Sequence, residues 1–143
     1  MPLMFQYRIY RTDLHTNRNV WYCFGDNDER VGYGGQAAEV RGEHNSLGVR
    51  TKKGPSHRDV DYYNDDELAE NMAKIGEDFQ VIETKLADGD IVVFPSDGFG
   101  TGLSELPERA PQTFRYVEDH IKRLIGLYGS DNDVFDVDGS ATG

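Results

Sequence analysis

The sequence of 143 residues contains one cysteine, Cys23, so no disulfide can form within the chain. Cys23 lies in an apolar, strand-like run, which favours a buried and unreactive thiol. No apolar run approaches the ~20 residues that a membrane span needs. The N-terminal "MPLMFQYRIYRTD" also lacks the apolar stretch and cleavage site of a signal peptide. We therefore expect a cytoplasmic protein without membrane contact.

Basic residues are scarce: 15 Lys and Arg stand against 26 Asp and Glu, a net charge of −11. A surface of that sign repels phosphate backbones at long range, which argues against general nucleic-acid binding. It leaves room for a small phosphorylated ligand, because backbone N–H groups can bind phosphate locally. The four histidines show no metal-ligand spacing, so we predict no metal site. No cofactor is predicted either.

The C-terminal stretch "SDNDVFDVDGSATG" contains four acidic residues and no Lys or Arg. This composition predicts a disordered acidic tail over residues 130–143, following a single domain over residues 1–129. A short partner-binding motif around Phe135 is the alternative interpretation of the tail. The oligomeric state is not predicted.

Short apolar runs alternate with helical patterns before the tail, which favours an α/β sheet covered by helices. The largest helix has apolar residues at three- and four-residue spacing from Leu68 to Leu86, a cap at Asn64 and a stop at Gly89. Strands are predicted at "FQYRIYRT" (5–12), "VWYCFG" (20–25), "NSLGVRTK" (45–52) and "DIVVFP" (90–95). The other helices are predicted between Gly35 and Gly42 and over residues 113–129.

Two of these strands are followed by a glycine-rich loop, and each loop precedes a helix. The first contains Gly32, Gly34 and Gly35, and the second, "GFGTGL", contains Gly98, Gly100 and Gly102. Glycine allows positive φ and close approach to a ligand, and such loops gather at the carboxyl ends of strands in open α/β sheets, where ligands bind. Neither loop has the closing Lys-Ser or Lys-Thr of a P-loop, and Leu103 stands where a dinucleotide fingerprint has its last glycine. The pattern indicates a diphosphate held by backbone amides, with a ribose held by Asp26, Asn27 or Asp97.

The stretch from "IVVFPSDGFGTGLSELPERAP" to Ile125 resembles the closing strand, phosphate loop and helix of macro domains. The stretch "YCFGDNDERVGYGGQAAEVRG" resembles their first loop, and the chain is also similar to a little-characterised phage and bacterial family with Gly-Asp-Asn and Gly-Gly-Gln-Ala. The resemblance implies a compact, macro-domain-like three-layer α/β fold that binds ADP-ribose or a related nucleotide. In one hydrolytic branch a carboxylate follows the second loop's Gly-Leu, where this chain has Ser104.

The resemblance matches Asn27 to the asparagine that touches the distal ribose, and the glycines of the two loops to the two phosphate loops. Asp26 and Asp97 are the candidate catalytic residues, because either could position a water against the ribose C1 carbon. The candidate ligand-binding residues are Gly25, Asn27, Gly32, Gly34, Gly35, Gln36, Ser96, Gly98, Phe99, Gly100, Thr101, Gly102 and Leu103. Phe99 is included because an aromatic ring between glycines could stack on a base or sugar.

Each of these residues also has a purely structural interpretation. Asp26 and Asn27 also suit a tight turn, Gln36 a solvated helix start, and Arg41 a pairing with Glu43 or with the loop. Lys52, Lys53 and Arg58 form a local basic patch that suits a diphosphate or simply a solvated loop. The predicted function is binding of an ADP-ribose-type nucleotide, with hydrolysis of an ADP-ribosyl bond as a candidate activity. The alternative is a non-catalytic module that sequesters a nucleotide or binds a protein.

Overall fold

The computed structural model describes residues 2–129, 134–135 and 141–142. Its main sheet has four parallel strands in the order β1-β4-β2-β3, namely β1 (Leu3–Gln6), β4 (Val92–Pro95), β2 (Trp21–Asn27) and β3 (Ser46–Lys52). The helices are α1 (Arg11–Thr16), α2 (Ala37–Val40), α3 (Leu68–Ala87), α4 (Leu106–Arg109) and α5 (Pro111–Tyr128), with 3-10 turns at Asp59–Asp61 and Asp65–Glu67. The predicted α/β sheet covered by helices is therefore confirmed, and the structure adds that its strands are parallel.

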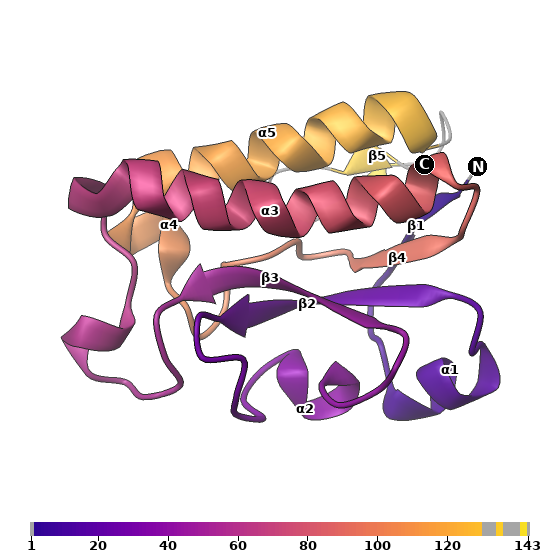
Figure 1. Cartoon of the computed structure of the whole chain (residues 1–143), viewed down its shortest axis with the longest axis horizontal. Coiled ribbons are helices and arrows are strands. Elements are labelled where there is room, and N and C mark those ends of the chain that lie inside the picture. Colours follow the sequence, from indigo (N-terminus) through magenta and orange to yellow (C-terminus); the bar gives the residue numbers. More distant parts are fainter. Residues whose placement is uncertain (1, 130–133, 136–140, 143) are drawn as a thin grey trace.

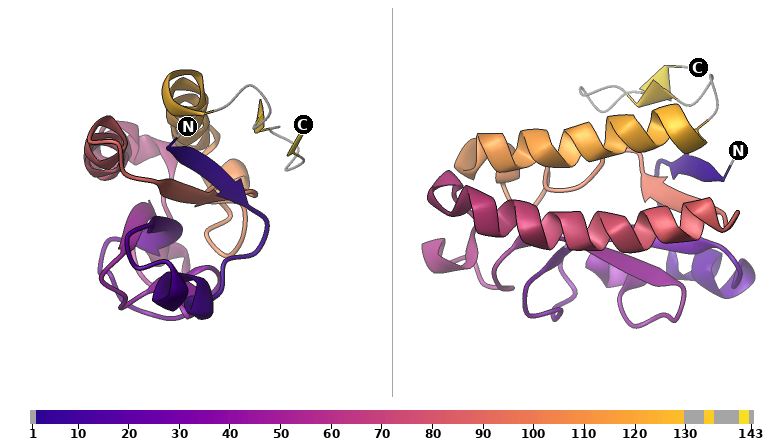
Figure 2. Two further views of the ribbon diagram at one scale, coloured as in Figure 1. Left: turned by 90° about the vertical axis from the view of Figure 1, so that its right-hand side faces the viewer. Right: turned by 45° about the horizontal axis from the view of Figure 1, so that its top comes forward.

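Helices cover both faces of this sheet, as Figures 1 and 2 show. The long helices α3 and α5 lie on one face and the short helices α1 and α2 on the other. The strands in the middle are apolar on both sides for this reason. In β2, Tyr22 and Phe24 pack with Leu14 and Val40 of the short helices, while Cys23 between them faces the larger core.

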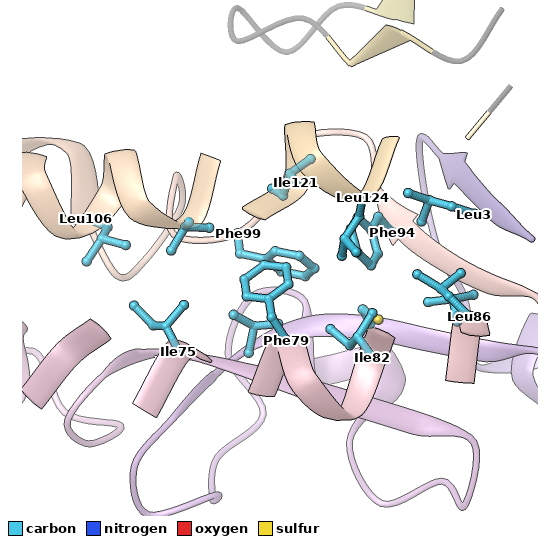
Figure 3. Close-up of a cluster of buried hydrophobic side chains, with 14 of the residues drawn as sticks. Leu3, Ile75, Phe79, Ile82, Leu86, Phe94, Phe99, Leu106, Ile121 and Leu124 are labelled. Carbon is cyan, nitrogen blue, oxygen red and sulfur yellow. The ribbon is translucent and has the colours of Figure 1, made fainter. Parts of the chain in front are cut away.

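The larger core lies between the sheet and the two long helices (Figure 3). Its aromatic centre is made by Phe79 of α3, Phe94 of β4 and Phe99 of the loop after β4, whose rings meet edge to face. Leu86, Ile121 and Leu124 are also at most 2% exposed. Burial of this set fixes the long helices over β4, and with them the start of the second glycine-rich loop.

The first predicted strand is partly wrong. The observed strand β1 begins at Leu3 and ends at Gln6. Residues Arg11–Thr16 form helix α1, which the sequence pattern did not indicate. The Asp13 carboxylate explains the change, because it accepts the backbone N–H of Tyr10 and the side-chain amide of Gln6, both at 2.8 Å. These bonds cap α1 and turn the chain away from the strand direction.

The predicted tail falls mostly outside the described residues, namely over 130–133, 136–140 and 143. Val134–Phe135 (β5) and Ala141–Thr142 (β6) pair as antiparallel strands. The side chain of Phe135, on which a partner-binding motif would depend, also lies outside the described part of the chain. Among the described helices, none combines the length and the apolar character needed to cross a bilayer.

Candidate functional site

A cavity of about 430 Å³ lies where the carboxyl ends of β2, β3 and β4 meet. The loop after β2 leads to α2 on one face of the sheet, and the loop after the neighbouring β4 leads to α5 on the opposite face. Ligands of open α/β sheets bind at such a switch point, because the loops diverge there and leave a crevice. The cavity is lined by Gly25, Asp26, Asn27, Val31, Gly32, Gly34, Gly35, Gln36, Ala37, Arg41, Thr51, Lys52, Pro55, His57, Asp97, Gly100, Thr101, Gly102, Leu103 and Ser104.

The structure thus brings most of the predicted site residues together. Gly34 of the first loop and Gly100 of the second share this cavity, and Leu103 lies so close to Gly34 that a Cβ there would be 3.0 Å from its Cδ1 atom. The predicted residues that do not line it are Ser96, Gly98 and Phe99. Phe99 is 1% exposed and packs in the larger core (Figure 3), so its ring cannot stack on a ligand in this cavity.

Asp26 is buried at the cavity wall, and both of its carboxylate oxygens are occupied. Oδ1 accepts from Arg41 at 2.5 Å and from the backbone N–H of Asn27, and Oδ2 accepts from Arg30 at 2.9 Å. Gly48 on β3 makes room for this group, since a Cβ there would lie 2.4 Å from Oδ2. Two guanidinium groups and a backbone N–H thus already occupy this carboxylate. The geometry therefore assigns Asp26 to holding the arginines rather than to activating water.

The ion pairs continue from Asp26 to the long helix α3. Arg30 also donates to Asp78 at 2.7 Å, and Asp78 accepts from Arg50 of β3. Burial opposes the charge of Arg50, but its hydrogen bonds to Asp78 and Glu77 outweigh burial and raise its pKa. This network anchors the first loop to the edge of the sheet and to α3.

Asn27 and Gln36 hold the first loop in shape. Asn27 donates to the carbonyl of Val31 at 2.7 Å and accepts the N–H of Glu29 at 3.0 Å. Gln36 accepts the N–H of Gly25 at 2.7 Å and donates to the carbonyl of Gly98 at 3.1 Å, so it joins the two loops. Both amides, predicted as ligand contacts, have their polar atoms engaged with the protein itself.

The Gln36 bridge also lies beside a second cavity of about 370 Å³, where the ends of β1 and β4 meet. Asp97 and Gly35 line both cavities, and Tyr7 and Tyr10 line only the second. Asp97 is exposed, and its carboxylate has no hydrogen bond or ion pair to any described residue. Of the two predicted catalytic carboxylates, Asp97 is thus the one available to a substrate or a water.

Backbone N–H groups are the donors that both loops offer. Within the part of the chain that the structure describes, the N–H groups of Gly34, Gly35, Thr101 and Gly102 donate to no protein acceptor. The hydroxyl of Thr101 donates to the carbonyl of Asp97 at 3.3 Å. Gly32, Gly35 and Gly100 have φ of 98°, 56° and 91°, which L side chains rarely adopt. The loop conformation therefore requires glycine at these three positions, and close packing on Leu106 requires it at Gly100 as well.

Lys52, expected in a basic patch or a solvated loop, lines the cavity. It ends β3, is 7% exposed, and donates from Nζ to the carbonyl of Ser56 at 2.6 Å. The rest of the basic patch differs, because Lys53 pairs with Glu67 and Arg58 is exposed. The position of Lys52 in the sequence could have indicated this role. Successive side chains of a strand point in opposite directions, so the last residue of β3 faces the site and Lys53 does not.

Burial lowers the pKa of Lys52, and the Arg109 charge lowers it further against the opposing effect of Asp61 and Glu105. Arg41, the other strong cation of the cavity, is already paired with Asp26 and donates from Nε to the carbonyl of Gly32. The cavity therefore combines backbone donors, one lysine without a carboxylate partner among the described residues, and an exposed carboxylate. No group of three or more His, Cys, Asp or Glu in the described ranges is placed to hold a metal ion.

Neither a curated protein nor a solved structure matches this chain. A family model does match, over residues 4–120, and its description is "family of unknown function (DUF7831)". The matched range includes both glycine-rich loops and every residue that lines the cavity between them. The chain belongs to the DUF7831 family.

Proposed function

We propose that the cavity between the two loops binds a nucleotide of the ADP-ribose type, with the diphosphate held by backbone N–H groups. The observation that carries the proposal is that two glycine-rich loops from neighbouring strands line one cavity, each with backbone N–H groups that no described residue accepts. Such groups bind anions without a charged side chain, which matters in a protein of net charge −11.

The size and position of the cavity support the same class of ligand. Its volume of about 430 Å³ lies within the ~300–1,000 Å³ of typical small-molecule sites. It occupies the switch point of a parallel sheet, where such sheets bind nucleotides. The macro-domain resemblance of both loops points to a diphosphate between them.

Isothermal titration with ADP-ribose tests the proposal. Binding to the wild-type protein, and weaker binding to Gly34→Ala, is the expected result, because the added methyl group lies in the cavity near Leu103. Gly126→Ala on α5 is the matched control, since a Cβ there meets no atom within 4 Å. No heat of binding at millimolar ADP-ribose, in folded protein, would rule the proposal out.

Hydrolysis of an ADP-ribosyl bond is a second candidate function, and the exposed, unpaired state of Asp97 is the observation that favours it. In this proposal the Asp97 carboxylate orients a water toward the ribose C1 carbon while the loop N–H groups hold the diphosphate. Asp97→Asn should then abolish turnover and leave ADP-ribose affinity nearly unchanged. Turnover that survives this substitution, or that is equally lost in the exposed control Asp119→Asn, would contradict it.

A further inference from the structure

Lys52 shares the ring of Tyr62 with a second cation. Its Nζ lies 4.4 Å from the centroid of the ring, and the guanidinium carbon of Arg109 lies 3.7 Å from the same centroid. Tyr62 is 3% exposed, so this contact is shielded from solvent. Arg109 is held in place by ion pairs with Asp59 and Glu105, both at 3.2 Å. The Arg109 charge therefore also opposes the charged form of Lys52, although by less than desolvation does.

The amine of Lys52 is desolvated, and the ring of Tyr62 together with the more distant charges of Asp61 and Glu105 only partly offsets this, so its pKa is lowered. Its hydrogen bond is to a neutral carbonyl, that of Ser56, and no described carboxylate lies within ion-pair distance. Its neighbour Lys53, in contrast, pairs with Glu67. Desolvation beside another cation raises the fraction of a lysine that is present as the nucleophilic neutral amine. Lys52 also lines the cavity, so a ligand there can reach it.

We infer that Lys52 captures carbonyl groups: its amine forms a reversible imine with the open-chain aldehyde of a phosphorylated reducing sugar bound in the cavity. The location of that sugar rests on the proposed function, in which its phosphate lies against the loop N–H groups. An ADP-ribose-type ligand belongs to this class, because the C1 carbon of its terminal ribose is an aldehyde when the ring opens.

The reaction needs only the amine, the aldehyde and water. The nitrogen lone pair of neutral Lys52 attacks the carbonyl carbon, a C–N bond forms, and the C=O π electrons move to the oxygen, which takes up a proton as the nitrogen loses one. The nitrogen lone pair then expels that hydroxyl, which leaves as water with the second proton of the nitrogen, and the C=N bond forms. Water reverses both steps, so no oxidant or reductant takes part.

Reductive trapping tests the inference. The protein is incubated with ADP-ribose or with ribose 5-phosphate in the presence of cyanoborohydride, which reduces the imine to a stable secondary amine, and the adduct is located by peptide mass spectrometry. We expect one adduct at Lys52, formed at least about tenfold faster than at Lys53, because Lys52 lines the cavity that holds the sugar and its amine is desolvated, whereas Lys53 is paired with Glu67. Labelling spread evenly over the surface lysines, or no labelling, would overturn the inference.

Two variants complete the test. Lys52→Arg keeps the positive charge and removes the primary amine, so the adduct should disappear, whereas Lys53→Arg should retain it. A Lys52→Arg protein that is still labelled to the same extent contradicts the inference. Because the adduct is mapped in the wild-type protein, the test stands even where Lys52→Arg folds poorly.

ADP separates this inference from the proposed function, because it carries the diphosphate but no reducing sugar. Binding of ADP with no trapping of ADP-ribose would leave the nucleotide site standing and show Lys52 to be only a phosphate counter-charge. Trapping of ribose 5-phosphate at Lys52 without any binding of ADP would overturn the nucleotide site and support the carbonyl site. If ADP does not bind and no sugar is trapped at Lys52, the nucleotide site and the carbonyl site are both overturned.

Discussion

The two glycine-rich loops look alike in sequence, but they are held by different forces. The loop after β2 is held by polar side chains: Asp26 binds Arg30 and Arg41, and Asn27 closes the turn. The loop after β4 is held by apolar ones, with Phe99 inserted in the core and Gly100 packed on Leu106. Similar glycine spacing therefore does not imply similar support, and the loops should respond differently to substitution.

The largest expected effect is on the apolar anchor of the second loop. Phe99→Ala removes a ring that is 1% exposed, and we expect it to lower the free energy of unfolding by about 3–5 kcal/mol. Leu103→Ala, at the 50% exposed tip of the same loop, should change it by less than about 0.5 kcal/mol. Urea denaturation of both variants measures this contrast, and similar values for the two would show that the core does not anchor the loop.

The corresponding change in the first loop is Asp26→Ala. It leaves Arg41, whose side chain is 12% exposed, without its carboxylate, and we expect a loss of about 2–4 kcal/mol. Arg30 contributes less to this loss, because it is 42% exposed and keeps Asp78. Glu77→Ala is the control, since Glu77 is 74% exposed and should cost less than about 0.5 kcal/mol. Thermal unfolding in which the two variants behave alike would remove the distinction between the loops.

Alanine at one glycine in each loop gives a sharper comparison. In Gly100→Ala the new Cβ would lie 2.8 Å from Leu106 at a φ of 91°, so we expect a loss of stability of about 2–3 kcal/mol. In Gly34→Ala the new Cβ meets the exposed Leu103 side chain, which can move, so stability should change by less than about 1 kcal/mol. ADP-ribose affinity should nevertheless fall in Gly34→Ala. Unchanged affinity there would mean that the glycines of the first loop serve only its folding.

The smallest expected effect concerns pH. Burial lowers the pKa of Lys52 from its ordinary value of 10.5, so above the lowered pKa the unfolded chain binds more protons than the folded one. Stability from this residue therefore rises with pH until about the ordinary lysine pKa is passed. As pH rises through that alkaline range, the unfolding midpoint of the wild type should increase relative to that of Lys52→Met. A difference that does not vary with pH contradicts this.

The sequence predicted the sheet, the long helices and the meeting of the two loops, because strand ends and glycines leave local signals. Helix α1 escaped detection because it buries only Leu14, so its pattern has no apolar period. The roles of Gln36 and Phe99 also escaped, since Gln36 bonds to Gly98, 62 positions away, and Phe99 meets Phe79 only across the core. Lys52 and Lys53 look equivalent in sequence, and only the end of β3 separates a cavity lysine from a surface ion pair.

The most direct measurement is a titration of the isotope-labelled protein with ADP, followed through its backbone amide resonances. If the loops form one diphosphate site, the N–H signals of Gly34, Gly35, Thr101 and Gly102 should move together along one saturable curve, while those of α5 stay in place. Shifts confined to a single loop, or none at millimolar ADP, would contradict the shared site.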